Sequence, residues 1–289
     1  NFDKYVSEKG NLRTLISKKY NINKNSIIYH NGTIDFLSLI LPIFVKNGHN
    51  IITPKNSWFA IDEISSKYNI NVKLSKMYIK NFIQHIDVDD IINNIDSNTR
   101  MICITAPILK LEFDKLYNKL LDYNIPILID LCYQDFTKDL QYSSIKNLLR
   151  NNVIMINTFS KLYSLPGLNL TYTIASKKLN IIIKNITNYP INEFKEQIAF
   201  SAINDTTRND MVIKYYTDEK ERIKKMLTDK KYYFSLQNTV KVETNLNEKE
   251  IQDKFNSNNI KMDIILNDKM LEFPISHKKI NDNIIKLIY

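Results

Sequence analysis

A serine and a lysine, Ser160 and Lys161, follow an apolar run in the stretch NTFSKLYSLPGLNLTY and precede a Pro-Gly turn. The apolar run predicts a buried strand, which would place the lysine in a loop that faces a cleft. An amine that is partly removed from water at such a place can form a Schiff base with an aldehyde. Lys161 is therefore the first candidate for a catalytic residue.

A carboxylate ends another apolar run. In ILIDLCYQDF, Asp130 is the first charged residue after the run, and Tyr133 follows three positions later. A carboxylate in low dielectric could pair with a buried cation, with the Tyr133 hydroxyl as a neighbouring donor. The simpler interpretation is that Asp130 caps a helix. The residues alone leave both interpretations open.

A glycine turn in HNGTID places Gly32 and Thr33 where a helix should begin. Free backbone N–H groups and the positive end of the helix dipole favour an anion such as phosphate at this position. An ordinary turn would use the same residues, so this motif becomes informative only in combination with the others.

The elements that must position these residues alternate along the first two thirds of the chain. Short continuous apolar runs predict strands that are covered on both faces, and amphipathic segments between them predict helices. The expected strands cover residues 51–54, 71–77, 101–107, 125–130 and 152–159, and the expected helices cover residues 12–20, 36–48, 58–68, 88–95 and 114–124. This alternation predicts an α/β fold with a mostly parallel sheet sandwiched by helices, whose ligands bind beyond the carboxyl ends of the strands.

The pattern changes at about residue 188. A long helical region ends near residue 227, and it is followed by expected strands at 240–244, 262–266 and 270–275 and helices at 249–255 and 282–288. We therefore expect a large cofactor-binding domain over residues 1–187. Residues 188–289 should form a helical connection and a small C-terminal α/β domain.

Composition excludes several other classes of protein. The net charge is +9, but the lysines are spread along the chain instead of clustering with aromatics, so we expect no nucleic-acid partner. No apolar run approaches 18 residues and no signal peptide is visible, which indicates no membrane partner and a cytoplasmic location. Cys103 and Cys132 lie in apolar contexts and should be reduced thiols, and the four histidines lack metal-ligand spacing.

Taken together, these parts match the needs of one cofactor. A phosphate cradle, an aspartate at a strand end and a lysine after a later strand are what pyridoxal 5'-phosphate requires: an anion site, a partner for the pyridinium nitrogen and an imine-forming amine. An aromatic residue to cover the ring completes the set, and Trp58, the only tryptophan, follows the strand at 51–54.

In these motifs the chain resembles the class I/II aminotransferases of the fold-type I pyridoxal phosphate superfamily. It looks closest to the branch that holds histidinol-phosphate aminotransferase and threonine-phosphate decarboxylase. SKLYSLPGLNLTY is similar to S-K-x-x-x-L-x-G-L-R-x-G-Y, IDLCYQDF to V-D-E-A-Y-x-x-F, and HNGTIDFL to N-G-S/A-x-E-x-L. NSWFAIDEISSKYNI fits the segment P-T-F/Y-x-x-Y, with Trp58 at the stacking position.

The resemblance implies a role for each residue. Lys161 would form the Schiff base and shuttle a proton, Asp130 would bond the ring nitrogen, and Tyr133 would bond the ring hydroxyl. The remaining cofactor contacts would come from Trp58 on the ring, from Gly32, Thr33 and Ser160 on the phosphate, and from Tyr5 of a neighbouring subunit. A homodimer is therefore the expected assembly.

Three positions depart from the family pattern. Leu109 stands where the family has an asparagine that bonds the ring oxygen, Asn169 replaces an arginine that binds the phosphate, and Glu272 aligns with the arginine that clamps the substrate carboxylate. A glutamate would repel that carboxylate. Three explanations remain: a lysine such as Lys269 supplies the charge, the substrate carries a cation or no carboxylate, or catalysis has been lost.

The expected function is that of a pyridoxal phosphate-dependent aminotransferase, a transferase of biosynthesis that acts on a small amine or amino acid through Lys161. One alternative is a decarboxylase of an amino acid or phosphoamino acid, which differs in the bond to Cα that lies perpendicular to the ring. The other is a catalytically degenerate scaffold protein that keeps the aminotransferase fold.

Overall fold

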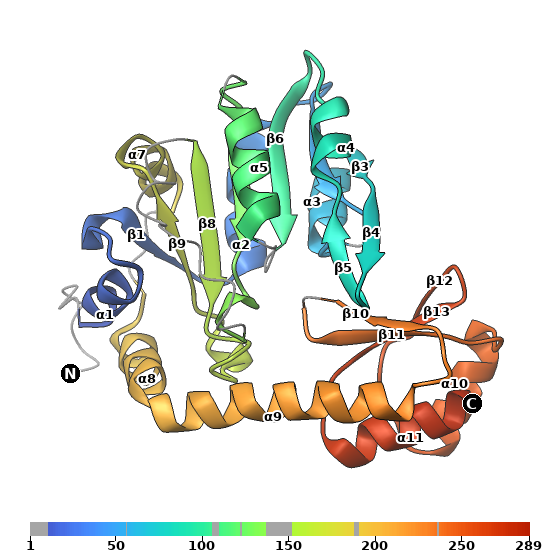
Figure 1. The fold of residues 1–289 in the computed structure, drawn as a ribbon. Coiled ribbons are helices and arrows are strands. Elements are labelled where there is room, and N and C mark those ends of the chain that lie inside the picture. Colours follow the sequence, from blue (N-terminus) through green and yellow to red (C-terminus); the bar gives the residue numbers. More distant parts are fainter. Residues whose placement is uncertain are drawn as a thin grey trace. The chain divides into compact units, whose positions relative to one another are not determined.

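The computed structural model describes residues 11–55, 57–105, 110–121, 123–136, 152–187, 191–235 and 237–289. The chain divides into two compact units (Figure 1). The first comprises Asn1–Met77 and Ile86–Asn209, and the second comprises Tyr78–His85 and Asp210–Tyr289. The domain boundary expected after residue 187 stays a prediction; the compact units separate at residue 209, and residues 78–85 belong to the second unit.

A seven-stranded sheet forms the first unit. Strand β9 pairs antiparallel with both of its neighbours, β1 and β8, and the other neighbouring strands pair in parallel, so the predicted mostly parallel sheet is confirmed. In spatial order the strands are β1 (Ile27–His30), β9 (Thr171–Ala175), β8 (Val153–Thr158), β7 (Ile127–Asp130), β6 (Thr99–Thr105), β2 (Asn50–Pro54) and β3 (Asn71–Ser75).

Helices follow the strands as the alternation predicts. The helices of this unit are α1 (Asn11–Tyr20), α2 (Thr33–Phe44), α3 (Ala60–Lys67), α4 (Val88–Asn93), α5 (Lys110–Leu120), α7 (Lys177–Ile186) and α8 (Glu193–Asn204). The apolar faces of α2, α3 and α7 pack with side chains from the sheet in one buried cluster. This packing holds the ends of the strands, and the first turn of α2, in fixed positions.

Helix α2 ends earlier than the sequence suggests. The apolar segment was expected to continue to Gly48, but the helix ends at Phe44 and Val45 adopts an extended conformation with φ of −123°. Val45 is buried in the core and its N–H still bonds to the carbonyl oxygen of Leu41. Gly48, with φ of 84°, belongs to the turn that leads into β2.

The second unit contains a six-stranded sheet. Its strands in spatial order are β12 (Ile265–Asn267), β13 (Met270–Pro274), β11 (Thr239–Glu243), β10 (Tyr232–Phe234), β5 (Ile83–Ile86) and β4 (Met77–Lys80). Its core is shared with α9 (Thr206–Met226), α10 (Glu248–Ser257) and α11 (Lys278–Ile288). Helix α9 begins in the first unit and continues through the second.

Sequence patterns did not reveal the hairpin of β4 and β5. Its two turn residues, Asn81 and Phe82, have φ of 52° and 60°, as the central residues of a type I′ turn require. Without a glycine at either position, the usual signal for such a turn is missing.

Candidate functional site

The predicted site residues gather at one edge of the seven-stranded sheet. Thr105, Asp130 and Ile156 are aligned on β6, β7 and β8, close to the carboxyl ends of these strands. His30 and Thr158, the last residues of β1 and β8, both pair with Thr171 at the start of β9. The two motifs that follow these strands, at Gly32 and at Lys161, are therefore brought to the same edge.

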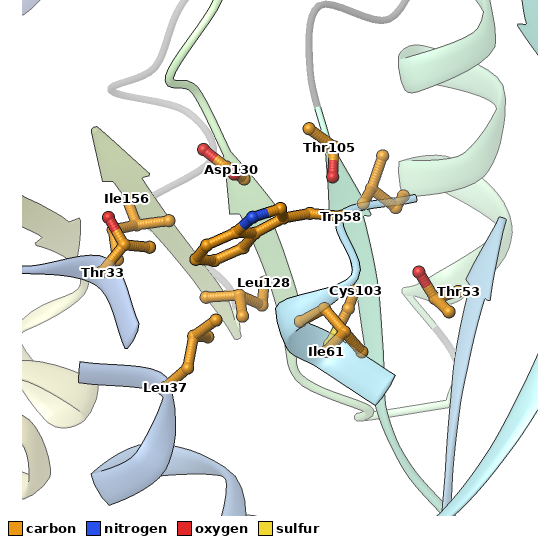
Figure 2. Close-up of a pocket in the computed structure, with 11 residues that line it drawn as sticks. Thr33, Leu37, Thr53, Trp58, Ile61, Cys103, Thr105, Leu128, Asp130 and Ile156 are labelled. Carbon is orange, nitrogen blue, oxygen red and sulfur yellow. The ribbon is translucent and has the colours of Figure 1, made fainter. Parts of the chain in front are cut away.

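A recess opens beside this edge, and it joins Trp58 with Asp130 and Thr33. Figure 2 shows the indole of Trp58 lying across the recess, between Asp130 at the end of β7 and the apolar floor at Leu128 and Leu37. The residues that line it are Thr33, Leu37, Thr53, Trp58, Ile61, Cys103, Ile104, Thr105, Leu128, Asp130 and Ile156. The recess thus has an apolar floor with hydroxyl groups and one carboxylate around it.

Asp130 is the carboxylate of this recess. Its Oδ1 accepts a hydrogen bond from the backbone N–H of Cys132 at 2.9 Å. Burial raises the pKa of Asp130 above its ordinary value, although the hydrogen bonds from Cys132 and the positive charge of Lys161 oppose the rise. A carboxylate in such surroundings gains from a cationic partner, because the partner offsets the cost of desolvation.

Lys161 lies beside Tyr133. Its Nζ is 5.3 Å from the centroid of the tyrosine ring and is a hydrogen-bonding partner of the phenol. Burial lowers the pKa of Lys161, but Tyr133, Cys132 and Asp130 outweigh this effect, and the net pKa lies above the ordinary value. The amine is therefore protonated at neutral pH, with a phenol and a carboxylate close to it.

The turn that carries Lys161 is held by short-range hydrogen bonds. Ser164 N–H donates to the carbonyl oxygen of Lys161 at 3.0 Å, and Leu165 N–H donates to that of Phe159 at 3.1 Å. Ser160 accepts a hydrogen bond from the Thr158 hydroxyl at 3.0 Å, so its side chain is fixed at the end of β8.

The glycine turn fits the predicted anion site. Gly32 has φ of 108°, and a Cβ at this position would collide with the side chain of Asn169. Gly32 is the N-cap of α2 and has no side chain to cap it, so the first backbone N–H groups of the helix are left for another acceptor. The Thr33 hydroxyl lies 3.0 Å from that of Thr171.

Asn169 has a contact that sequence reasoning did not anticipate. Its Nδ2 donates to the carbonyl oxygen of Asn31 at 2.7 Å, and the residue adopts a left-handed conformation with φ of 45°. Asn169 therefore fastens the Lys161 loop to the glycine turn. Its contact with a cofactor phosphate stays a prediction.

Two further basic residues near this edge carried no signal in the sequence. Lys195 of α8 donates to Oδ1 of Asn31 at 3.0 Å, which places an ammonium group next to the glycine turn. Lys19 of α1 forms a 2.6 Å ion pair with Asp135, and its Nζ also lies 3.3 Å from the Tyr163 hydroxyl. Only the folded chain brings these residues to the site.

Glu272 lies in the second unit, where its charge is balanced. Its two carboxylate oxygens contact Lys241 Nζ at 2.9 Å and the Thr239 hydroxyl at 2.6 Å, and the Lys241 side chain is only 4% exposed. Lys241 and Glu272 are cross-strand partners on β11 and β13. Lys241, rather than the exposed Lys269, is thus the lysine that pairs with Glu272.

Two predicted positions, Tyr5 and Leu109, lie outside the described residues. Among the residues that the structure does describe, no helix has the length and apolar character needed to cross a membrane. The same residues include no cluster of three or more potential metal ligands.

The chain is similar to curated aminotransferases over most of its length. It is 27% identical over 228 residues to the histidinol-phosphate aminotransferase of Pelagibacter ubique, a match that covers 75% of this chain and 62% of the relative. The corresponding protein of Brachyspira hyodysenteriae is 31% identical over 223 residues, which cover 74% of this chain and 61% of that protein. The matched part of the chain thus spans less than two thirds of these relatives.

Solved structures support the fold. A histidinol-phosphate aminotransferase from Sinorhizobium meliloti, solved with pyridoxal 5'-phosphate, superposes with a TM-score of 0.85 at 15% identity, covering 99% of this chain and 83% of that one. The histidinol-phosphate aminotransferase from Clostridium acetobutylicum superposes with a TM-score of 0.85 at 21% identity, and the match covers 100% of this chain and 90% of that one. These matches confirm the expected fold type I. The family model "Aminotransferase class I and II" matches residues 7–231, and the chain therefore belongs to this family of pyridoxal phosphate-dependent transferases.

Proposed function

We propose that this chain is a pyridoxal phosphate-dependent aminotransferase that acts on a small amine or amino acid, with Lys161 as the reactive amine. The observation that carries the proposal is the cluster of Lys161, Tyr133 and Asp130 at the carboxyl edge of the sheet. A structural lysine has no need of a phenol and a buried carboxylate beside a recess.

The residues present fit the cofactor. Helix α2 has Gly32 as its N-cap and no side-chain cap, so its first backbone N–H groups are available to a phosphate, and the close packing of Gly32 against Asn169 leaves no space for a larger residue in this turn. Thr53 lines the recess, and its buried hydroxyl is without a hydrogen-bonding partner among the described residues. The indole of Trp58, which lies across the recess above its apolar floor, offers an aromatic surface on which the cofactor ring could stack.

When bound, pyridoxal phosphate supplies an aldehyde that reacts with amines and a ring that withdraws electrons from the substrate carbon. Asp130 would accept a hydrogen bond from the ring nitrogen, and Tyr133 would bond the ring hydroxyl oxygen. Trp58 would cover the ring. The phosphate would be held by Gly32, Thr33, Ser160 and Asn169.

Lys161 would carry the proton that the reaction moves. Its Nζ must lose a proton before it can act as a nucleophile or base, and Tyr133 is the group placed to hold or return that proton. Lys161 and Tyr133 each lie three residues after the end of a strand, β8 and β7, and the parallel pairing of these strands brings both groups to the same edge of the sheet.

The charge balance at Glu272 bears on the choice of substrate. The ion pair of Glu272 with Lys241 has no net charge, so it provides neither the strong attraction of an arginine nor strong repulsion of a carboxylate. We propose that glutamate is not the preferred amine donor and that donors without a second carboxylate react faster. The names of the curated relatives add histidinol phosphate to the donors that should be screened.

The assembly and location are also proposals. A homodimer in which Tyr5 reaches the partner subunit's cofactor phosphate would complete the site. The proposed role is in biosynthesis and the proposed location is the cytoplasm. The location is supported by the two buried free thiols, Cys103 and Cys132, which suit a reducing compartment.

A titration with pyridoxal phosphate tests the proposal. Trp58 is the only tryptophan and lies in the recess, so binding should quench its emission while a new visible absorption band develops. Lys161→Ala should lose the band that depends on the amine, and Lys115→Ala, which removes an exposed ammonium that pairs with Asp89, should keep it. Wild-type protein that gives neither quenching nor a visible band would refute the proposed function.

A further inference from the structure

An arginine contacts the turn that carries Lys161. Arg208 lies in the first turn of α9, and its guanidinium donates to the carbonyl oxygen of Leu162 at 2.8 Å and to the Ser164 hydroxyl at 2.7 Å. Both are charge-assisted hydrogen bonds, which are stronger than those between neutral groups. Arg208 thus bonds residues on the carboxyl side of Lys161, one and three positions after it.

The turn itself needs such support. Ser164 adopts a left-handed conformation with φ of 54°, which is unfavourable for a residue other than glycine. Apart from Arg208, the turn is held by the bond from Ser164 N–H to the Lys161 carbonyl, by the bond from Leu165 N–H to the Phe159 carbonyl, and by the 3.3 Å contact of Lys19 with the Tyr163 hydroxyl. Lys161 and Ser164 are both exposed, so these bonds compete with water.

Helix formation does not explain why an arginine occupies this position. A cation in the first turn of a helix is opposed by the positive end of the helix dipole. The helix start is already capped by Asp205, whose Oδ1 accepts from the backbone N–H of Arg208. The guanidinium also donates to Asn209 Oδ1 at 3.2 Å, a longer hydrogen bond than either of its bonds to the turn that carries Lys161. The two bonds to the lysine turn are therefore the main gain from the guanidinium.

We propose that Arg208 is a positioning residue for Lys161, which it acts on by holding the backbone of the turn from Leu162 to Ser164. Its catalytic consequence rests on the proposed function, because only a reactive Lys161 needs such precision. Displacement of a reacting amine by about 1 Å can slow a reaction on the order of a hundredfold. The residue lies outside every motif that the sequence offered.

The experiment compares four variants of the full chain. Arg208→Gln removes both charge-assisted bonds, and Arg208→Lys can restore one of them. Ser164→Gly removes the hydroxyl partner and relieves the left-handed strain, so it tests the contact without a cost in folding. Arg100→Gln is the matched control, because the Arg100 guanidinium also makes two hydrogen bonds, in this case to the backbone carbonyls of Ser97 and Thr99, but lies at the opposite end of β6.

Hydrogen–deuterium exchange in the absence of cofactor measures the turn directly. In Arg208→Gln we expect the amides of Ser164 and Leu165 to exchange about tenfold faster, with Arg208→Lys and Ser164→Gly intermediate and Arg100→Gln unchanged. With cofactor and an amine donor, kcat should fall about tenfold in Arg208→Gln while KM stays within about twofold. Arg208→Lys should recover part of kcat, which a general loss of stability would not produce.

Unchanged exchange of these two amides in Arg208→Gln, or an equal increase in Arg100→Gln, would overturn the inference. Faster exchange together with a change in KM alone would also overturn it. If wild-type protein fails to bind pyridoxal phosphate, the proposed function is refuted, and the exchange comparison still decides whether Arg208 holds the turn.

Discussion

Removing the imidazole of His30 should make the protein less sensitive to acid. His30 is the last residue of β1, directly before the glycine turn, and it is 5% exposed. Its Nε2 lies 2.9 Å from the Thr173 hydroxyl, its ring centroid lies 4.4 Å from that of Phe36, and its Nδ1 has no hydrogen-bonding partner among the described residues. Burial lowers the pKa of His30 from 6.5 to about 3.

The sign and size of the effect follow from this shift. Because the folded state holds the imidazole neutral, the unfolded chain binds more protons between pH 6.5 and pH 3, and stability falls as the pH falls through this range. Between pH 7 and pH 5, protonation of His30 in the unfolded chain should reduce the free energy of unfolding by about 2 kcal/mol. Below pH 3 the loss is complete.

Urea unfolding at pH 7 and pH 5 provides the assay, with Trp58 emission as the signal because Trp58 reports on the first unit. The change in unfolding free energy with pH should be smaller by about 2 kcal/mol in His30→Gln than in the wild type. His49→Gln controls for the loss of an imidazole elsewhere in the same unit. An equal change with pH in the wild type and His30→Gln would refute the inference that a buried neutral His30 limits acid stability.

Three further predictions, each with its own substitution and measurement, test the site itself. Gly32→Ala should destabilise the first unit by about 1–3 kcal/mol in urea unfolding, because its φ of 108° is accessible mainly to glycine; adding Asn169→Gly should recover only the steric part. Asp130→Asn should abolish turnover in an amine-donor assay with little loss of stability, whereas Asp135→Asn should mainly lower stability by breaking its ion pair, and equal turnover in both would contradict the assignment. Lys195→Gln should weaken pyridoxal phosphate binding about fivefold in a Trp58 quenching titration, equivalent to ~1 kcal/mol, and unchanged affinity would show that this ammonium does not serve the phosphate.

Residues close to the ends of predicted strands could be found from the sequence. Asp130 and Lys161 each follow a continuous apolar run, and such runs are typical of buried parallel strands whose carboxyl ends meet at one edge. The glycine turn was a weaker signal, because a Gly-Thr pair before an apolar helix is also typical of an ordinary turn, and it became informative only together with the other motifs. The fold and the main contacts of the site therefore depended on local patterns.

Contacts between distant segments could not be found in this way. Arg208 lies 46 and 44 positions after Leu162 and Ser164, the two residues that it contacts in the turn after Lys161. Lys195 lies 164 positions after its partner Asn31. No periodicity or motif connects such pairs, since they depend on how α8 and α9 pack. Lys241 was likewise indistinguishable from other lysines until the register of β11 and β13 placed it opposite Glu272.

Borohydride reduction followed by peptide mass spectrometry tests the central claim most directly. The full chain is saturated with pyridoxal phosphate, reduced and digested, and the site of the reduced cofactor adduct is located. Because Lys161 lies beside Tyr133 and interacts with the charge of Asp130, which lines the recess, we expect the adduct on Lys161 alone and none in Lys161→Ala. An adduct on another lysine, or equal labelling of many lysines in both proteins, would contradict the account.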